Sequence, residues 1–317
     1  MKQHAIATIL AVVVLILGGG FLFWQSNDDT YDTDNSTTVE AELYEQAPAS
    51  AETSELVERE NSETLTSDYL SDYTLIDEQY NTEVEVTIDE ATNTRTITAN
   101  ALPNHDTGDF PNQGNPNTIS EQARLYVYPF DPSFTGAMAQ PKTIGVALNG
   151  VKFEPGTAET FTCGSGERYR VEAIQDSADL GLDFNNAHVQ PTGEYHYHGA
   201  SSMLADAFDN GEDLVHVGFA ADGFLIYYSK SSAYASSYVL GDGERSGSNC
   251  QFSLPNQSVQ YSSVKDGTVT SDYDYVEGAG DLDECNGTTI AGQYVYLVTE
   301  EFPFISRCLN GAVSSLR

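Results

Sequence analysis

The chain has 317 residues and a formal net charge of −35, with 13 Lys and Arg residues against 48 Asp and Glu residues. Nucleic acids attract basic proteins, so this charge balance excludes nucleic acid as a partner. The same negative charge favours cations as ligands, because it attracts them to the protein surface.

The first residues, 1–25, predict a transmembrane signal anchor. An uncharged apolar run from Ala5 to Trp24 follows Lys2 and spans about 30 Å as a helix, the thickness of a bilayer's hydrocarbon core. Phe21 and Phe23 occupy the place where a cleavage site needs small residues, so an uncleaved anchor is favoured over a cleaved signal peptide. Lys2 before the span places the N-terminus in the cytoplasm. We therefore expect an inner-membrane anchor and a C-terminal part in the cell envelope, periplasmic or extracellular.

The segment that follows, residues 26–79, predicts a disordered acidic linker. Residues 27–66 carry twelve acidic side chains, one basic side chain (Arg59) and few large apolar ones. Such a composition buries too little apolar surface to offset the entropy of ordering the chain. Repulsion between like charges extends this kind of linker without any partner.

Four cysteines lie in the part of the chain that is expected outside the cytoplasm, where disulfides form and persist. Four cysteines allow three connectivities. We favour Cys163 with Cys250, and Cys285 with Cys308, because the second pair brackets one compact segment. A zinc site of four thiolates competes with this interpretation, but the chain has no C-x-x-C pair to supply its usual spacing.

Alternating apolar and polar residues from residue 80 onward predict a mostly β domain. A two-residue turn at Asn149 and Gly150, with positive φ at both positions, is expected to join two short strands. Further strands are expected at 84–88, 95–99, 124–130, 214–219, 224–228 and 293–298, and short helices at 177–182 and 201–209. The expected fold is one sandwich-like domain, residues 80–317, built from two packed antiparallel sheets.

The stretch NNAHVQPTGEYHYHGAS, residues 185–201, is the most informative motif of the chain. In a strand, His196 and His198 point to one face and the two neighbouring tyrosines to the other, because side chains alternate. A hairpin centred on Thr192 sets His188 opposite His196, so all three imidazoles share one face. Three histidines in this arrangement suit zinc or copper. The competing interpretation is a polar aromatic cluster in which each ring is hydrogen-bonded to a neighbour.

The motif GEYHYHG, with AHVQPTG before it and AADGF and DLDECNG after it, resembles the YHYH domain family of exported bacterial proteins. The resemblance extends over PNHDTGDFP, ALNGVKFEPGTAE and YVYLVTEEFPFISRCLNG, and implies a domain core at residues 102–311. Leu225 and Tyr228 replace the Pro and Gly of the family pattern, and the segment after DLDECNG is shortened. The family has no assigned activity, so the resemblance implies domain limits and no reaction.

Three residues are candidates for a catalytic role. Asp283 and Glu284, beside Cys285, are candidate ligands or bases at a metal site, although acids that cap loop N–H groups are the favoured interpretation. His105 is a candidate general base, although a histidine beside an Asx-type turn is favoured.

His216 is expected to be a strand histidine with satisfied hydrogen bonds, and Asp222-Gly223 a turn. The acidic residues 272–284 suggest calcium as an alternative ion, without the EF-hand spacing.

Two functions remain open from the sequence. The first is an envelope protein that binds zinc or copper through His188, His196 and His198, with hydrolysis by a metal-bound water if the protein is an enzyme. The second is a non-catalytic surface or adhesion module in which the histidines are structural and the linker sets the reach. The sequence identifies neither a substrate nor a protein partner.

Overall fold

The computed structural model describes residues 65–254 and 256–313. The expected anchor and most of the expected linker, residues 1–64, lie outside the described residues. Within the described ranges, no helix is long and apolar enough to cross a membrane.

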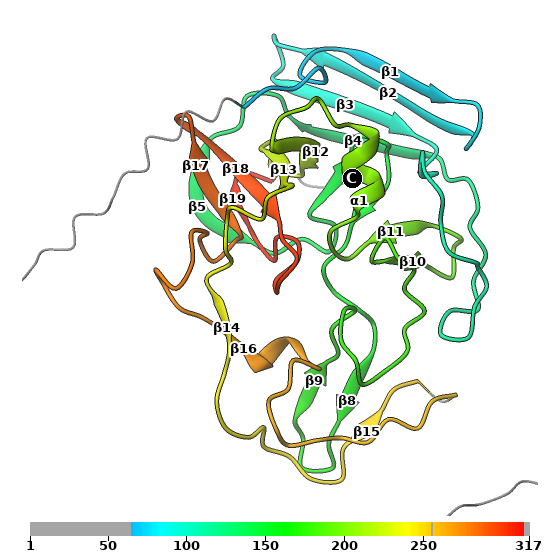
Figure 1. Cartoon of the computed structure of the whole chain (residues 1–317), viewed down its shortest axis with the longest axis vertical. Helices are drawn as coiled ribbons and strands as arrows, with labels where there is room; N and C mark the ends of the chain where they lie inside the picture. Colours follow the sequence, from blue (N-terminus) through cyan, green and yellow to red (C-terminus); the bar gives the residue numbers. More distant parts are fainter. Residues whose placement is uncertain (1–64, 255, 314–317) are drawn as a thin grey trace, which may run out of the picture. The chain divides into compact units, whose positions relative to one another are not determined.

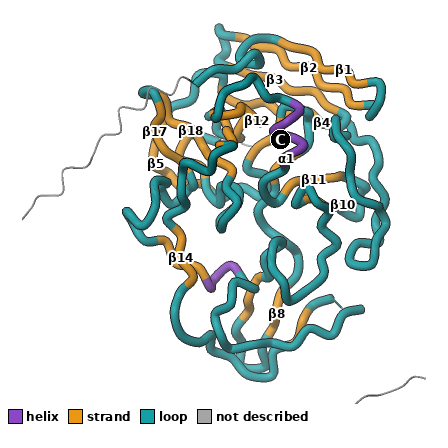
Figure 2. Tube along the Cα trace, in the orientation of Figure 1, coloured by secondary structure: helices purple, strands orange, loops and turns teal. Residues whose placement is uncertain are grey.

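The described residues form a mostly β structure with several sheets, so the predicted fold class is confirmed at this level (Figure 1). Its helices in the described ranges are α1 (Ser202–Ala207) and the 3₁₀ helix η1 (Thr270–Asp272), and loops join most of the strands (Figure 2). Ser201 caps α1 by accepting a hydrogen bond from the Leu204 N–H, as expected for a helix at 201–209. The helix expected at 177–182 is absent, because Gln175 and Asp179 bind the backbone of that segment as turn residues.

The largest sheet has eight strands. Its order is β10 (Ala187–Val189), β11 (Tyr195–Tyr197), β7 (Lys152–Phe153), β6 (Gly145–Ala147), β12 (Leu214–Ala220), β13 (Leu225–Ser229), β18 (Gln293–Val298) and β17 (Gly287–Ile290). Two neighbouring pairs, β11 with β7 and β13 with β18, are parallel. The expectation of two antiparallel sheets is therefore wrong. Both parallel pairs join strands that are far apart in sequence, and local alternation carries no information about such pairings.

The second sheet is a four-stranded meander in the order β1 (Tyr73–Asp77), β2 (Thr82–Asp89), β3 (Thr94–Ala99) and β4 (Arg124–Pro129). The strand β1 lies inside the range that the sequence assigns to the linker. Tyr73 and Leu75 pack against the main core, and the Tyr73 hydroxyl donates to the Leu148 carbonyl at 3.1 Å. Because alternate side chains of β1 are partly buried against the core, the structured domain begins before residue 80.

Three small sheets complete the fold. They pair β5 (Phe134–Ala139) with β19 (Leu309–Gly311), β14 (Tyr238–Leu240) with β16 (Tyr273–Tyr275), and β8 (Thr160–Thr162) with β9 (Arg168–Arg170) and β15 (Gln251–Phe252). The last sheet has its own apolar cluster, formed by Phe161, Val171, Ala178, Leu180 and Val269. We call β8, β9, β15 and this cluster the small lobe.

Two disulfides are present, Cys163–Cys250 and Cys285–Cys308, and these are the pairs favoured from the sequence. Cys285 and Cys308 are fully buried in the main core, whereas Cys163–Cys250 connects the end of β8 to the start of β15 in the small lobe. No free cysteine remains, so a zinc site of four thiolates is excluded.

The turn between β6 and β7 differs from the expected two-residue form. Gly150 has φ of +83°, whereas Asn149 does not have positive φ. The Gly150 N–H donates to the Ala147 carbonyl, and the Ala147 N–H donates to the Val151 carbonyl, so the loop contains three residues, 148–150. The Asn149 side chain instead caps the Val151 N–H and donates to the Tyr197 hydroxyl.

Replacing Gly150 tests this turn. A Cβ at Gly150 would lie 2.4 Å from the Ala99 Cβ, and the backbone there has positive φ. We expect Gly150→Ala to lower the free energy of unfolding by about 1–3 kcal/mol, through strain and overpacking. Gly156→Ala is the matched control, since a Cβ there meets nothing within 4 Å. Equal urea midpoints for the two variants would contradict this description of the turn.

Candidate metal centre

The hairpin of β10 and β11 brings the first two histidines together. His188 lies directly opposite His196 in the antiparallel register, as the sequence predicts. The turn is closed by the Gly193 N–H, which donates to the Gln190 carbonyl at 2.8 Å, and Gly193 has φ of +86°. Glycine is favoured in this left-handed conformation because it has no Cβ. A short turn therefore fixes the register that aligns the imidazoles.

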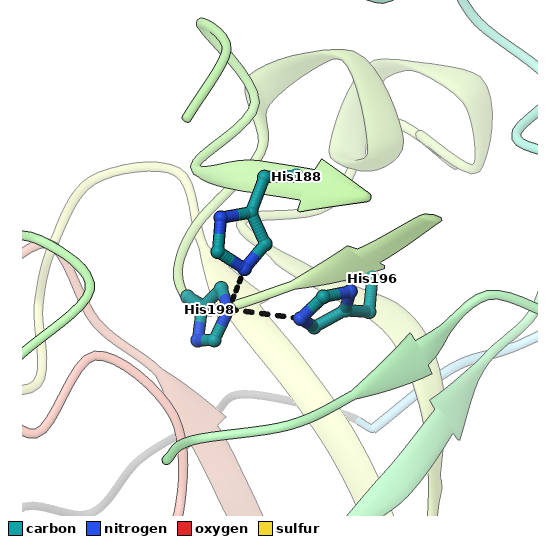
Figure 3. Close-up of side chains that lie close together, drawn as sticks. All are labelled: His188, His196 and His198. Atoms are coloured by element: carbon teal, nitrogen blue, oxygen red, sulfur yellow. Dashed lines mark hydrogen bonds between the residues drawn. The ribbon is translucent and has the colours of Figure 1, made fainter. Parts of the chain in front are cut away.

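The three imidazole rings point their Nε2 atoms toward one another (Figure 3). His198 Nε2 lies 3.1 Å from His188 Nε2 and 3.0 Å from His196 Nε2. Ring centroids are 4.7 Å apart for all three pairs. Within the ranges described, this is the one group of three or more His, Cys, Asp or Glu side chains whose ligand atoms are close enough to hold a metal ion.

Backbone carbonyls set the tautomers of two rings. His188 Nδ1 lies 2.8 Å from the Leu180 carbonyl, and His196 Nδ1 lies 3.3 Å from the Glu194 carbonyl. A carbonyl only accepts, so each Nδ1 carries the proton and each neutral ring presents an Nε2 lone pair to the cluster. His198 Nδ1 is buried and has no hydrogen-bond partner among the described residues.

Burial keeps the three imidazoles neutral. His196 and His198 are each 2% exposed, and burial lowers the pKa of both well below the usual histidine value. Burial also lowers the pKa of His188, which is partly exposed. Loss of hydration disfavours the charged ring, and the neighbouring imidazoles add to this effect. The rings are therefore uncharged at neutral pH, and the Nε2 lone pairs of His188 and His196 can bind a cation.

A buried ionic network lies beside the histidines, and the sequence reasoning missed it. Lys152 of β7 pairs with His196 in the parallel register, and its Nζ contacts Glu154 at 2.6 Å and Glu194 at 3.2 Å. Gln190 accepts from Lys152 and donates to Glu154. Glu194 lies two residues before His196, and Gln190 lies two residues after His188. Side-chain alternation alone could therefore have placed both on the face of the histidines.

His105 lies on the opposite face of β11, away from the three histidines. Its Nδ1–H donates to the Asp106 carbonyl, and its Nε2 accepts from the Tyr197 hydroxyl at 2.6 Å. Asn149 donates to the same hydroxyl at 3.0 Å. The ring is 6% exposed, and burial lowers its pKa. His105 is a buried member of a closed hydrogen-bond network.

Asp283 and Glu284 are not brought to the histidines either. Asp283 Oδ1 accepts from the N–H groups of Cys285 and Gly287, and Oδ2 accepts from the Tyr294 hydroxyl and Asn310 Nδ2. Glu284 has an exposed side chain. Both contacts of Asp283 to backbone N–H groups are those of a loop-capping acid, the interpretation favoured from the sequence. Within the described chain, no three acidic side chains of residues 272–284 gather closely enough to hold a metal ion, so this segment adds no support for calcium.

His216 and Asp222 both have structural contacts. His216 donates through Nε2–H to the Gly218 carbonyl and accepts from the Ser67 hydroxyl at 2.6 Å, as expected for a satisfied strand histidine. Asp222 is fully buried at a turn, where it accepts from the Tyr296 hydroxyl at 2.6 Å and the Gly311 N–H at 2.8 Å. Its role is to tie β12, β18 and β19 together.

A family model described as YHYH protein matches residues 122–311, more than half of the chain. The chain belongs to the YHYH protein family. The resemblance stated from the sequence motifs is thus confirmed, and the matched range of the YHYH domain contains all three clustered histidines. Searches of curated proteins and of solved structures gave no match. The function of the YHYH domain must therefore be argued from its own geometry.

The buried His216 predicts an acid sensitivity of the YHYH domain. Burial lowers its pKa to about 3 in the folded state, against about 6.5 in the unfolded chain. Between these values the unfolded chain binds the extra proton, so stability is complete above pH 6.5 and is lost as pH falls toward 3. This residue alone contributes a loss of about 1.4 kcal/mol per pH unit in that window.

The variant His216→Gln measures this contribution, because the other buried histidines are common to both proteins. From pH 7 to pH 5 we expect the wild type to lose about 2 kcal/mol more unfolding free energy than the variant. Urea unfolding at the two pH values gives both numbers. An identical loss in wild type and variant would show that His216 does not titrate in this way.

Proposed function

We propose that the YHYH domain binds one zinc or copper ion through His188, His196 and His198. The observation that carries this proposal is the convergence of three Nε2 atoms, of which at most that of His198 has a proton to donate, because His188 and His196 donate their Nδ1–H to carbonyls. One proton satisfies at most one of the two facing lone pairs fully. A cation placed between the three Nε2 atoms can bind all three of them. Imidazole nitrogen is a preferred ligand of zinc and copper.

The distances fit an ion after a small expansion. Nitrogens bound tetrahedrally to zinc at 2.0–2.1 Å lie about 3.3–3.4 Å from one another. The separations of 3.0 and 3.1 Å from His198 are therefore a few tenths of an ångström short of that geometry. Small rotations of the side chains open this gap without any change in the backbone register of β10 and β11.

Histidines that bind a metal usually donate their other ring N–H to a nearby acceptor, and such acceptors are present here. Carbonyl groups of Leu180 and Glu194 accept from the Nδ1–H groups of His188 and His196, which orients both rings and increases their basicity. At His188 the carboxylates of Glu159, Glu154 and Asp183 oppose the lowering of its pKa by burial, whereas Lys152 adds to the lowering of the pKa at His196 and His198. The carboxylates therefore favour a cation on the His188 side of the site, and Lys152 opposes one on the other side.

Hydrolysis receives less support than binding alone. A three-histidine donor set leaves a fourth position, at which a bound water would have a lowered pKa. His196 and His198 are almost fully enclosed, however, and the expected bases Asp283 and His105 take part in other hydrogen-bond networks. We therefore propose metal binding, without a reaction, as the function of this site.

The place of action is part of the proposal. Two disulfides suggest a domain outside the cytoplasm, where such bonds persist. With the N-terminal anchor expected from the sequence, we infer an envelope protein whose metal site faces the periplasm or the exterior. Metal availability there, rather than affinity alone, would select between zinc and copper.

Metal content tests the proposal directly. We expect the full-length protein, purified in detergent without chelator or affinity histidines, to carry about one zinc or copper per chain by elemental analysis. His196→Ala should remove this metal, because two imidazoles remain and the fixed geometry is lost. His216→Gln is the control, since that histidine lies outside the cluster and should leave the metal content unchanged.

A folded wild type that neither carries nor takes up zinc or copper would overturn the proposal. Tyrosine near-ultraviolet circular dichroism establishes the fold independently of metal. Equal metal in wild type and His196→Ala would place the ion elsewhere and would also contradict the assignment.

A surface-binding module is the second candidate, favoured by a separate observation. A cleft of about 550 Å³ is lined by aromatic side chains of Phe134, Phe224 and Tyr294, with Asp281 and Asp283 at its border. Phe134 is 57% exposed, so an apolar ring of this cleft is accessible to a partner. In this alternative the three histidines remain structural, and the metal measurement separates the two functions.

A further inference from the structure

We propose that the Cys163–Cys250 disulfide controls the metal affinity of the three-histidine site, so that its reduction releases the ion. This inference rests on the proposed function, because it concerns the regulation of the same site. It follows from one contact between the small lobe and a histidine, and from the different exposure of the two disulfides.

The small lobe holds His188 in place through Leu180. The Leu180 carbonyl accepts the His188 Nδ1–H at 2.8 Å, while the Leu180 side chain is buried among Phe161, Val171 and Val269 of the lobe. His188 is the partly exposed member of the cluster, so this hydrogen bond is its main orienting contact. If Leu180 moves, the His188 ring loses the partner that directs its Nε2 toward the other histidines.

The segment after β15 contacts the residue before Leu180, and Asn112 donates to the carbonyl of Gly181 on its other side. Gln257 accepts from the Asp179 N–H at 3.2 Å and donates to the Asp179 carbonyl, directly before Leu180. The pairing of β15 with β8 is short: Gln251 pairs with Thr162 and Phe252 with Phe161, and Ser253 adds two hydrogen bonds to Thr160. The Cys163–Cys250 disulfide adds the covalent link between these two short strands, and it closes a loop with a sequence separation of 87. A cross-link over such a loop strongly restricts the chain.

The two disulfides differ in their access to reductants. Cys285 and Cys308 are 0% and 2% exposed, whereas Cys250 is partly exposed at the edge of the small lobe. Thiol–disulfide exchange needs a thiolate to reach a sulfur atom, so the bond in the small lobe is the one that reacts first. Reduction should loosen the lobe without detaching it, because Arg307 holds Glu172 at 2.7 Å independently of the disulfide.

The reductant is a dithiol, such as an exported thiol–disulfide oxidoreductase in its reduced form. One of its thiolates attacks Cys250 Sγ, the Cys163–Cys250 bond breaks, and a mixed disulfide forms. The second thiolate then resolves this intermediate, which leaves two cysteine thiols in the YHYH domain and an oxidised dithiol. Two electrons and two protons pass to the cysteines, and the metal ion leaves without any change in its charge.

The order of reduction is tested first, on the metal-free full-length protein. Graded dithiothreitol, followed by alkylation and peptide mass spectrometry, should label Cys163 and Cys250 well before Cys285 and Cys308. Simultaneous labelling, or earlier labelling of the buried pair, would overturn the proposal. This selectively reduced and alkylated protein is kept for the next measurements, with circular dichroism as the check of its fold.

Metal affinity is tested next, by competition with a chromophoric zinc chelator. We expect the Cys163/Cys250-reduced protein, and the Cys163→Ser/Cys250→Ser variant, to bind zinc about 10–100-fold more weakly than the oxidised wild type. Unchanged affinity in a folded reduced protein would contradict the coupling. If the variant does not fold, the chemically reduced wild type still decides the question.

A metal-free readout separates failure of this inference from failure of the proposed function. In 15N-histidine-labelled apo-protein, the Nδ1–H of His188 should be protected from solvent exchange when the disulfide is intact and should exchange faster after its reduction. Coupling to His188 without any zinc binding would refute the proposed function alone. Zinc binding with an unchanged His188 Nδ1–H would refute the disulfide control alone.

Discussion

The mutual approach of three neutral imidazoles on one face of the β10–β11 hairpin is the constraint around which the site is organised. Backbone carbonyls fix the Nδ1 protons of His188 and His196, so both Nε2 lone pairs point at His198. Burial keeps the rings unprotonated. Protonated rings would carry like charges, repel one another and move apart. With at most one proton between three nitrogens, the cluster lacks positive charge at its centre. The ion that we propose would supply that charge.

Polar networks lie on both faces of β11 and hold the three histidines in place. On the histidine face, the parallel pairing of β11 with β7 places Lys152, with its two glutamates, beside His196. On the other face, the Tyr197 hydroxyl joins His105 and Asn149 in a buried network. Most polar groups around the hairpin are satisfied by a neighbour, which keeps it rigid in a low-dielectric interior. Two buried atoms among the described residues of these networks have no hydrogen-bond partner, namely Glu194 Oε1 and His198 Nδ1, and the second lies within the proposed site.

Local patterns in the sequence predicted the site better than they predicted the fold. Side-chain alternation and one turn were enough to place His188 opposite His196, because a hairpin depends only on neighbouring residues. The parallel pairs β11–β7 and β13–β18 depend on long-range topology, and the sequence pattern does not encode them locally. Lys152 was missed for the same reason, whereas alternation could have placed Glu194 and Gln190 beside the histidines. Asp283 and His105 were candidates by residue type alone, and their contacts became clear only from the fold.

X-ray absorption spectroscopy of the metal-loaded, full-length protein tests the central claim most directly, because it identifies both the element and its ligand atoms. The account predicts zinc or copper with three imidazole nitrogens at about 2.0–2.1 Å, visible through the multiple scattering of the rings, and no sulfur ligand. A first shell of oxygen or sulfur atoms, or a folded protein with no bound metal to measure, would contradict it.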